Sequence, residues 1–91
     1  MTHTVICAYD IADDRERARV ERVASRWGRR IQKSVFWIPL ASRYQRNRLV
    51  RELRELEIQS GSILLIPAPR WQTVVTVGDD VLDPESHAWI A

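Results

Sequence analysis

The sequence predicts a single α+β domain in which two helices cover one face of a sheet. Its 91 residues are enough for one domain. Two apolar runs without strict alternation, Val5–Tyr9 and Ile63–Ile66, are typical of strands that are buried on both faces. Between these runs, apolar residues recur at spacings of three and four over Asp13–Trp27 and Arg43–Ile58, as amphipathic helices require.

The first predicted strand covers Thr4–Tyr9 and places Asp10 at its carboxyl end. In sheets with helical crossovers, this end of a strand often carries functional residues. Either Asp13 or Asp14 is expected to cap the helix that follows. Glu16 lies three residues after Asp13, at the spacing of a capping box.

The first predicted helix, Asp13–Trp27, carries a cationic stripe beside its apolar one. Gly28 follows the helix and is expected to end it in the left-handed conformation. Arg17 lies between the two stripes. The cationic stripe consists of Arg15, Arg19, Arg22 and Arg26.

A second extended region runs from Arg29 to Leu40, and its pattern fits either one bent strand or two short ones. Polar Gln32 and Ser34 indicate a bulge or a bend, and Pro39 marks the end of the region. The remaining predicted elements are a helix over Arg43–Ile58 capped by Ser42, a strand over Ile63–Ile66, and a last strand over Gln72–Val77 ending at Gly78. We therefore expect a domain over residues 1–78 and an acidic tail over residues 79–91.

The pattern also predicts a partner for the sheet. Two helices can cover only one face, yet the first and third strands look buried on both faces. A second copy of the chain on the open face resolves this conflict, and the two-fold dimer is the commonest oligomer. We therefore predict a symmetric homodimer.

Charge is distributed unevenly along the chain. Between Arg15 and Arg54 there are thirteen Arg or Lys and three acids, a net charge of +10, whereas the remainder has one Arg and nine acids. Arg presents a planar fork that suits phosphate. The alternatives are a solvated face with surface ion pairs and a nucleic-acid-binding surface, and the scarcity of acids favours the second.

Other classes of protein are disfavoured. No apolar run approaches the length of a membrane span, and the first residues lack the basic segment of a secretory signal. The protein is therefore expected in the cytoplasm. The single cysteine, Cys7, lies in the first apolar run and is expected to be a core residue.

Two motifs resemble the CRISPR-associated Cas2 family. They are Tyr-Asp-Ile-Ala-Asp-Asp at Tyr9–Asp14 and Gln-Lys-Ser-Val-Phe at Gln32–Phe36, with Gly28 between them. The resemblance extends over residues 4–78. It implies a ferredoxin-like βαββαβ sandwich with an extra C-terminal strand, and a homodimer in which that strand extends the partner's sheet. It also implies a complex with the Cas1 integrase during spacer acquisition.

Carried over by position, the resemblance implies a nuclease site. Tyr9 and Phe36 in this site are also residues typical of a protein core. Trp37, directly after Phe36, departs from the acidic or small residue that many family members have. The implied site consists of Tyr9, Asp10, Arg17, Arg19, Arg30 and Phe36.

Phosphodiester cleavage requires a metal or a positioned base. Mg²⁺, with Mn²⁺ as the alternative, prefers oxygen ligands. One chain offers only Asp10 at the end of the strand, so two copies of Asp10 in a dimer would share the metal. The alternative role of Asp10 is to cap a turn.

Four functions are consistent with these features. The first two are a dimeric scaffold that bridges Cas1 integrase subunits along duplex DNA, and a metal-dependent endonuclease acting at the paired Asp10. The other two are a toxin-like ribonuclease of the same fold and a ferredoxin-like regulatory domain. Arginine stripes without interleaved aromatics favour duplex DNA over single-stranded RNA. The predicted nucleic-acid-binding residues are Arg15, Arg17, Arg19, Arg22, Arg26, Arg30, Lys33, Arg43 and Arg46.

The acidic tail ends in an apolar pair. Trp89 and Ile90 follow the four acids of the tail. They would either anchor a partner such as the integrase or fold back on their own dimer.

Overall fold

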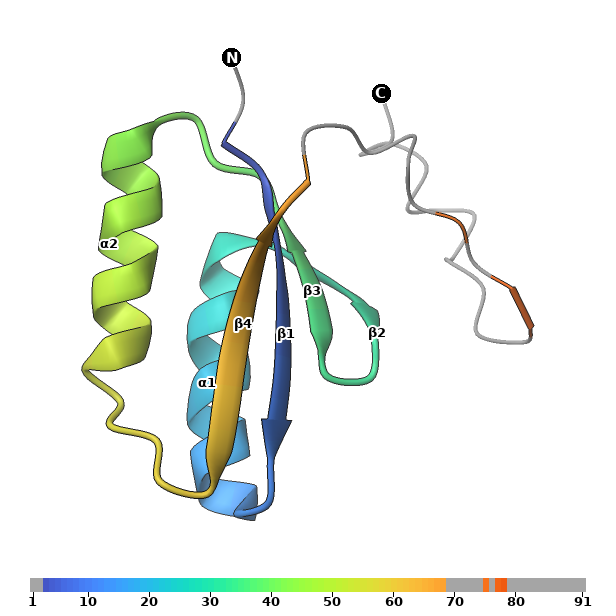
Figure 1. Cartoon of the computed structure of the whole chain (residues 1–91), viewed down its shortest axis with the longest axis vertical. Coiled ribbons are helices and arrows are strands. Elements are labelled where there is room, and N and C mark those ends of the chain that lie inside the picture. Colours follow the sequence, from blue (N-terminus) through green and yellow to red (C-terminus); the bar gives the residue numbers. More distant parts are fainter. Residues whose placement is uncertain (1–2, 69–74, 76, 79–91) are drawn as a thin grey trace.

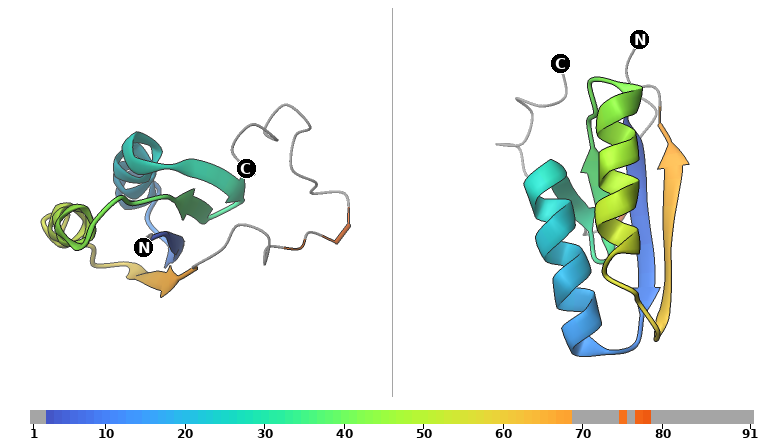
Figure 2. Two further views of the ribbon diagram at one scale, coloured as in Figure 1. Left: turned by 90° about the horizontal axis from the view of Figure 1, so that it is seen from above. Right: turned by 90° about the vertical axis from the view of Figure 1, so that its left-hand side faces the viewer.

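A computed structural model describes residues 3–68, 75, 77 and 78 of the chain. These residues form a four-stranded antiparallel sheet with strand order β2-β3-β1-β4, and two helices pack on one face of it (Figures 1 and 2). The order of elements is βαββαβ, as the ferredoxin-like expectation requires. None of the helices among the described residues is long and apolar enough to cross a membrane.

The central strand β1 (Val5–Ile11) is longer than predicted, and Asp10 lies within it. Helix α1 (Asp14–Trp27) begins after Asp13, whose side chain accepts a hydrogen bond from the Glu16 backbone N–H at 2.8 Å. Asp13, and not Asp14, is therefore the N-cap. The carboxylate of Glu16 bonds elsewhere, so the reciprocal half of the capping box does not form.

Gly28 ends α1 in an extended conformation (φ −163°), and the predicted left-handed conformation was wrong. The reason for a glycine at this position is close packing. A Cβ atom on Gly28 would lie 2.1 Å from the carbonyl oxygen of Trp37 and 2.8 Å from the Cα of Ile38. At Gly28, where the chain leaves α1, it therefore approaches β3 so closely that no side chain fits.

The second extended region forms two strands, β2 (Arg29–Gln32) and β3 (Val35–Ile38), joined by a tight turn. The register shifts between Arg30 and Gln32, which confirms the bulge. Ser34 in the turn has a φ of 66°, a left-handed conformation that few side chains adopt.

Helix α2 (Arg43–Arg54) is capped by Ser42, whose hydroxyl accepts a hydrogen bond from the Gln45 backbone N–H. It ends four residues earlier than predicted, because Glu57 turns into the left-handed region (φ 51°). The edge strand β4 (Gly61–Pro67) follows. The predicted last strand Gln72–Val77 and the tail lie largely or wholly outside the described residues.

The core lies between the helices and one face of the sheet. Alternate residues of β1 face it, with Val5, Cys7, Tyr9 and Ile11 all at most 6% exposed. The same cluster includes Val20, Val23, Ala24, Phe36, Ile38, Leu40, Leu49 and Leu53. The helices therefore use only one face of the sheet, as the sequence predicts.

Candidate nucleic-acid interface and Asp10 face

The sheet face opposite the helices carries apolar side chains and Asp10. Ile6 and Ala8 of β1 are half-buried on this face, and Asp10 is exposed. In β4, Leu64 pairs with Ala8 and is 58% exposed, and Ile66 pairs with Ile6 and is 46% exposed. We call the surface made by Ile6, Ala8, Asp10, Leu64 and Ile66 the open face.

A hydrogen-bonded clasp fixes the chain around Asp10. The buried carboxylate of Glu16 accepts hydrogen bonds from the backbone N–H groups of Gln59 (3.0 Å) and Ser60 (2.9 Å). It also accepts one from the Ser60 hydroxyl at 2.6 Å, and that hydroxyl accepts from the Asp13 N–H. The Ser60 hydroxyl is the main reason why the pKa of Glu16 is lowered.

Glycine is required where this clasp leads into β4. A Cβ atom on Gly61 would lie 1.8 Å from the carbonyl oxygen of Asp10. The clasp and the close approach of Gly61 together hold the start of β4 against the end of β1. They place Ser62 beside Asp10 in the sheet.

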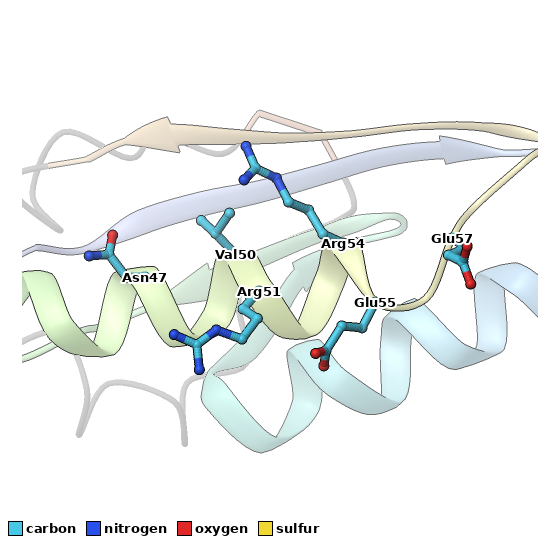
Figure 3. Close-up of a pocket in the computed structure, with 6 residues that line it drawn as sticks. All are labelled: Asn47, Val50, Arg51, Arg54, Glu55 and Glu57. Atoms are coloured by element: carbon cyan, nitrogen blue, oxygen red, sulfur yellow. The ribbon is translucent and has the colours of Figure 1, made fainter.

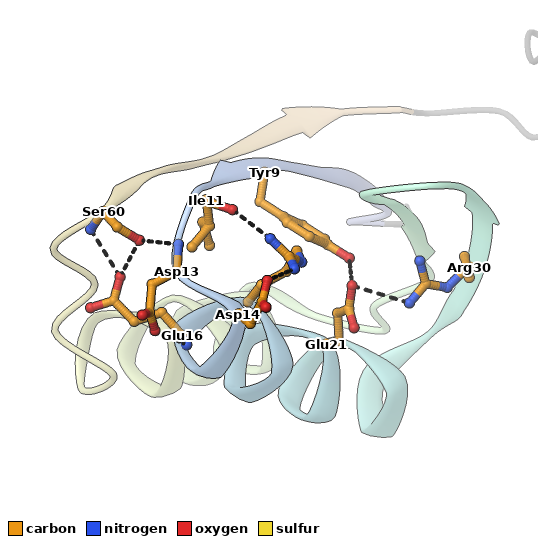
Figure 4. A network of polar contacts seen from close by, with 9 residues as sticks. Tyr9, Ile11, Asp13, Asp14, Glu16, Glu21, Arg30 and Ser60 are labelled. Atoms are coloured by element: carbon orange, nitrogen blue, oxygen red, sulfur yellow. Dashed lines mark hydrogen bonds and ion pairs between the residues drawn. The ribbon is translucent and has the colours of Figure 1, made fainter.

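Glu21 joins Tyr9 and Arg30 on the helix side of the sheet (Figure 4), and the Phe36 ring lies against both of them. The Tyr9 hydroxyl donates to Glu21 Oε2 at 2.6 Å, and the Arg30 guanidinium lies 3.3 Å from the same oxygen. Arg30 also lies over the Phe36 ring, 5.1 Å from its centroid, and the Tyr9 ring stacks on Phe36 at 6.3 Å. Tyr9 and Phe36 are core residues, at 6% and 2% exposed.

This network alters the acidity of its members. Burial, reinforced by the hydrogen bond to the Glu21 carboxylate, raises the pKa of Tyr9 to about 12. The hydrogen bond from Tyr9 lowers the pKa of Glu21, and Arg30 adds to that effect. Tyr9 is thus held as a neutral phenol that donates a hydrogen bond, and it is a poor general base.

The other predicted site residues are separate from this network. Arg17 donates to the Ile11 carbonyl oxygen at 2.9 Å and pairs with Asp14, so it ties the end of β1 to α1. Arg19 is exposed on α1, where it lines a pocket shared with α2. Within one chain the six predicted residues therefore divide among the open face, the core and the helix layer.

The arginines of the two helices are mostly exposed. All four members of the predicted stripe, Arg15, Arg19, Arg22 and Arg26, are exposed, as are Arg30, Lys33, Arg43 and Arg46. Arg17 is half-buried. A shallow pocket along α2, seen in Figure 3, is lined by further charged residues, including Arg51, Arg54 and Glu55.

The three acids of the basic stretch all make internal bonds. Glu16 forms the clasp and Glu21 forms the core network. Glu52 accepts from the Trp27 indole N–H at 2.9 Å and pairs with Arg26 at 3.2 Å and Arg48 at 3.8 Å. Since these acids are committed, seven arginines make no ion pair within 4 Å among the described residues, namely Arg15, Arg19, Arg22, Arg43, Arg46, Arg51 and Arg54.

Sequence reasoning did not single out Glu16, Glu21 or Ser60 as organising residues. The available signal was the rarity of acids in the stretch Arg15–Arg54. An acid retained in so basic a segment is expected to have a specific partner. The partners themselves lie 9 to 44 residues away along the chain, and a local pattern does not identify them.

The described residues of a single chain do not form a Mg²⁺ site. Among the described residues, no three His, Cys, Asp or Glu side chains group closely enough to hold a metal. Asp10 offers a single exposed carboxylate, while Mg²⁺ in proteins is held by one or two carboxylates together with substrate phosphates. A metal at Asp10 would therefore depend on a second chain or on the nucleic acid.

Residues 3–74 of the chain match the family model described as CRISPR associated protein Cas2. The chain belongs to the Cas2 family. No curated protein matches the sequence. The Cas2 assignment supports a CRISPR-associated role for this protein.

Solved structures of similar fold agree with the Cas2 assignment. A hypothetical protein, TT1823 from Thermus thermophilus, is 26% identical with a TM-score of 0.75, covering 86% of this chain and 93% of that one. A structure described as cas2 is 26% identical with a TM-score of 0.72, covering 88% and 91%. Streptococcus pyogenes Cas2 at pH 6.5, at 23% identity, shares the fold with a TM-score of 0.69, covering 82% of this chain and 99% of that one.

Proposed function

We propose that this Cas2 protein is a homodimeric scaffold of CRISPR adaptation that binds duplex DNA and bridges subunits of the Cas1 integrase. The observation that supports this proposal best is the set of seven helical arginines that make no ion pair within 4 Å among the described residues. Such a surface binds the DNA backbone without reading its sequence, and its affinity falls steeply with salt.

The open face supports the dimer. Leu64 and Ile66 remain about half exposed beside the half-buried Ile6 and Ala8. Contiguous exposed apolar side chains of this kind are typical of protein–protein interfaces. A second copy seated there would leave the helices, on the opposite face, free to contact DNA.

A metal-dependent endonuclease is the second candidate. Its support is the position of Asp10, which is exposed on the same face that the two copies would share. Two carboxylates would then be available for Mg²⁺ or Mn²⁺. The scaffold requires less, because the lone Asp10 is a sparse metal site. Tyr9, Arg30 and Phe36 contact one another on the helix side of the sheet, away from Asp10.

Cleavage and binding assays on the same protein separate the two functions. Labelled duplex DNA and single-stranded RNA would be incubated with the wild type and with Asp10→Asn, in Mg²⁺, Mn²⁺ or EDTA. The scaffold predicts no cleavage by either protein and salt-sensitive duplex binding by both. Metal-dependent cleavage that is lost in Asp10→Asn, with binding retained, would establish the endonuclease instead.

A matched control excludes an effect of Asp10→Asn on the fold. Ser62→Ala alters the neighbouring residue of β4 on the same face and leaves the carboxylate intact. It should bind and react as the wild type does. Preference for RNA over duplex DNA in the same assay would contradict the proposal and favour the ribonuclease.

A further inference from the structure

A groove runs between α1 and α2 on the helical side of the molecule. One wall is formed by Arg19, Arg22 and Arg26 of α1. Val23 and Leu56 contribute apolar surface to the same groove. Because the open face lies on the opposite side of the sheet (Figure 2), a dimer formed there leaves this groove accessible.

The cationic wall of the groove is only partly neutralised. Glu52 and Glu55 also line the groove. The Glu52 carboxylate already binds Arg26 and the Trp27 indole, whereas Glu55 makes no ion pair within 4 Å among the described residues. Arg19 and Arg22 make no ion pair within 4 Å among the described residues. Arg19 and Arg22 thus remain outside close ion pairs beside apolar surface, with Glu16 acting on Arg19 only at longer range.

One segment of the chain has the complementary chemistry. Residues 79–91 contain four acids (Asp79, Asp80, Asp83 and Glu85), no Arg or Lys, and the apolar pair Trp89 and Ile90. The body between His3 and Ala68 carries thirteen Arg or Lys and eight acids, a net charge of +5. The segment, with four negative charges, and the body, with a net charge of +5, are thus of opposite sign and similar magnitude.

The extended length of the segment exceeds the longest dimension of the molecule. Thirteen residues span up to about 43 Å when extended, at roughly 3.3 Å per residue. The longest principal extent of the molecule is 35 Å. Covalent attachment also raises the effective concentration of the segment at the groove, so weak contacts suffice for docking.

We propose that the acidic segment 79–91 docks in the groove between α1 and α2 and competes there with nucleic acid. Its acids pair with Arg19 and Arg22, and Trp89 covers the apolar surface at Val23 and Leu56. The competition rests on the proposed nucleic-acid-binding function, whereas the docking does not. The segment thereby restrains non-specific DNA binding until a strong ligand displaces it.

Two full-length variants test the proposal, each compared with the wild type. The first neutralises the acids by Asp79→Asn, Asp80→Asn, Asp83→Asn and Glu85→Gln. The second, Trp89→Ala with Ile90→Ala, leaves net charge unchanged. Duplex affinity at low salt and the amide NMR signals of Val23 and Leu56 are measured for each, and thermal unfolding checks the fold.

Docking predicts that both variants bind duplex more tightly, by about tenfold for the neutralised one because four competing charges are removed. It also predicts that the Val23 and Leu56 signals shift in both. A gain confined to the neutralised variant, with no shifts, would mean general electrostatic repulsion and would overturn the docking. Unchanged affinity and signals in both variants would overturn it equally.

The same measurements distinguish a failure of the proposed function from a failure of the docking proposal. If the wild type and both variants all fail to bind duplex, the nucleic-acid function is wrong. The Val23 and Leu56 signals then decide the docking by themselves. As a further check, Arg19→Gln with Arg22→Gln should abolish the shifts caused by Trp89→Ala, since the tail would no longer be docked in that background.

Discussion

The side chains of Tyr9 and Asp10 lie on opposite faces of the sheet, although the residues are neighbours in the chain. Tyr9 is 6% exposed and donates a hydrogen bond to Glu21, whereas Asp10 is exposed on the open face. Alternation along a strand imposes this separation. A nuclease site that used both side chains on one substrate would therefore conflict with the fold of the single chain.

Glu21→Gln should lower the pKa of Tyr9 from about 12 toward its ordinary value of 10.0. The shift should be partial, because burial is the larger cause and remains. The raised pKa means that the neutral phenol stabilises the fold fully below pH 10, and that this stability is lost as pH rises through 12. In a Tyr44→Phe background, Tyr9 is the only tyrosine, so absorbance of the phenolate measures it directly.

Stability should fall as the solution is acidified below about pH 4.5, the ordinary pKa of the Glu carboxyl. The pKa values of Glu16, Glu21 and Glu52 are all lowered in the fold, so their stabilising effect is present above that pH and disappears as they are protonated. Glu16→Gln should lower the melting temperature at pH 7 and flatten its dependence on acid pH. Glu57→Gln, an exposed carboxylate, is the control and should do neither.

Gly28→Ala should destabilise the protein by about 1–3 kcal/mol, as overpacking commonly does. The added Cβ would lie 2.1 Å from the Trp37 carbonyl oxygen, and backbone atoms cannot move aside as a side-chain tip can. Urea unfolding measures the change. Ser25→Ala, an exposed position in the same helix, should be neutral or slightly stabilising. A stable Gly28→Ala variant would show that α1 can move away from the sheet.

Leu64→Glu should convert the proposed dimer to a monomer that keeps its fold. Leu64 is 58% exposed on the open face, so the charge disturbs a partner more than the core. Light scattering coupled to size-exclusion chromatography measures the mass. Asn47→Glu, exposed on α2, is the control for added charge. A wild-type monomer at all concentrations would contradict the dimer.

Arg19→Gln combined with Arg22→Gln should weaken duplex binding and reduce the slope of log affinity against log salt by about 2, roughly 1 per phosphate contact. The pair Arg51→Gln and Arg54→Gln removes the same charge from α2. A smaller loss in that control would localise the DNA on α1. Equal losses of affinity in the two variants would indicate that the positive charges of both helices attract the DNA without a localised contact.

The sequence determined the elements, because each depends on neighbours in the chain. Apolar periodicity located both helices, and Ser42 and Asp13 capped them as their side chains predict. Polar Gln32 and Ser34 indicated a bulge or a bend, and the structure shows a register shift between Arg30 and Gln32. The sequence also predicted that one face of the sheet would lack helices, because two helices can cover only one face.

Tertiary structure decided which side chains meet. Glu21 joins Tyr9 and Arg30, and Glu16 joins Ser60, over separations that no local pattern encodes. Gly28 was correctly located, but its role depends on how closely α1 approaches Trp37. The sequence by itself thus determined the elements and the excess of arginine. Only the packed fold committed the three acids of the basic stretch to internal bonds and left seven arginines without an ion pair within 4 Å among the described residues. The physical reason is that hydrogen bonds and ion pairs act over a few ångströms in space, irrespective of distance along the chain.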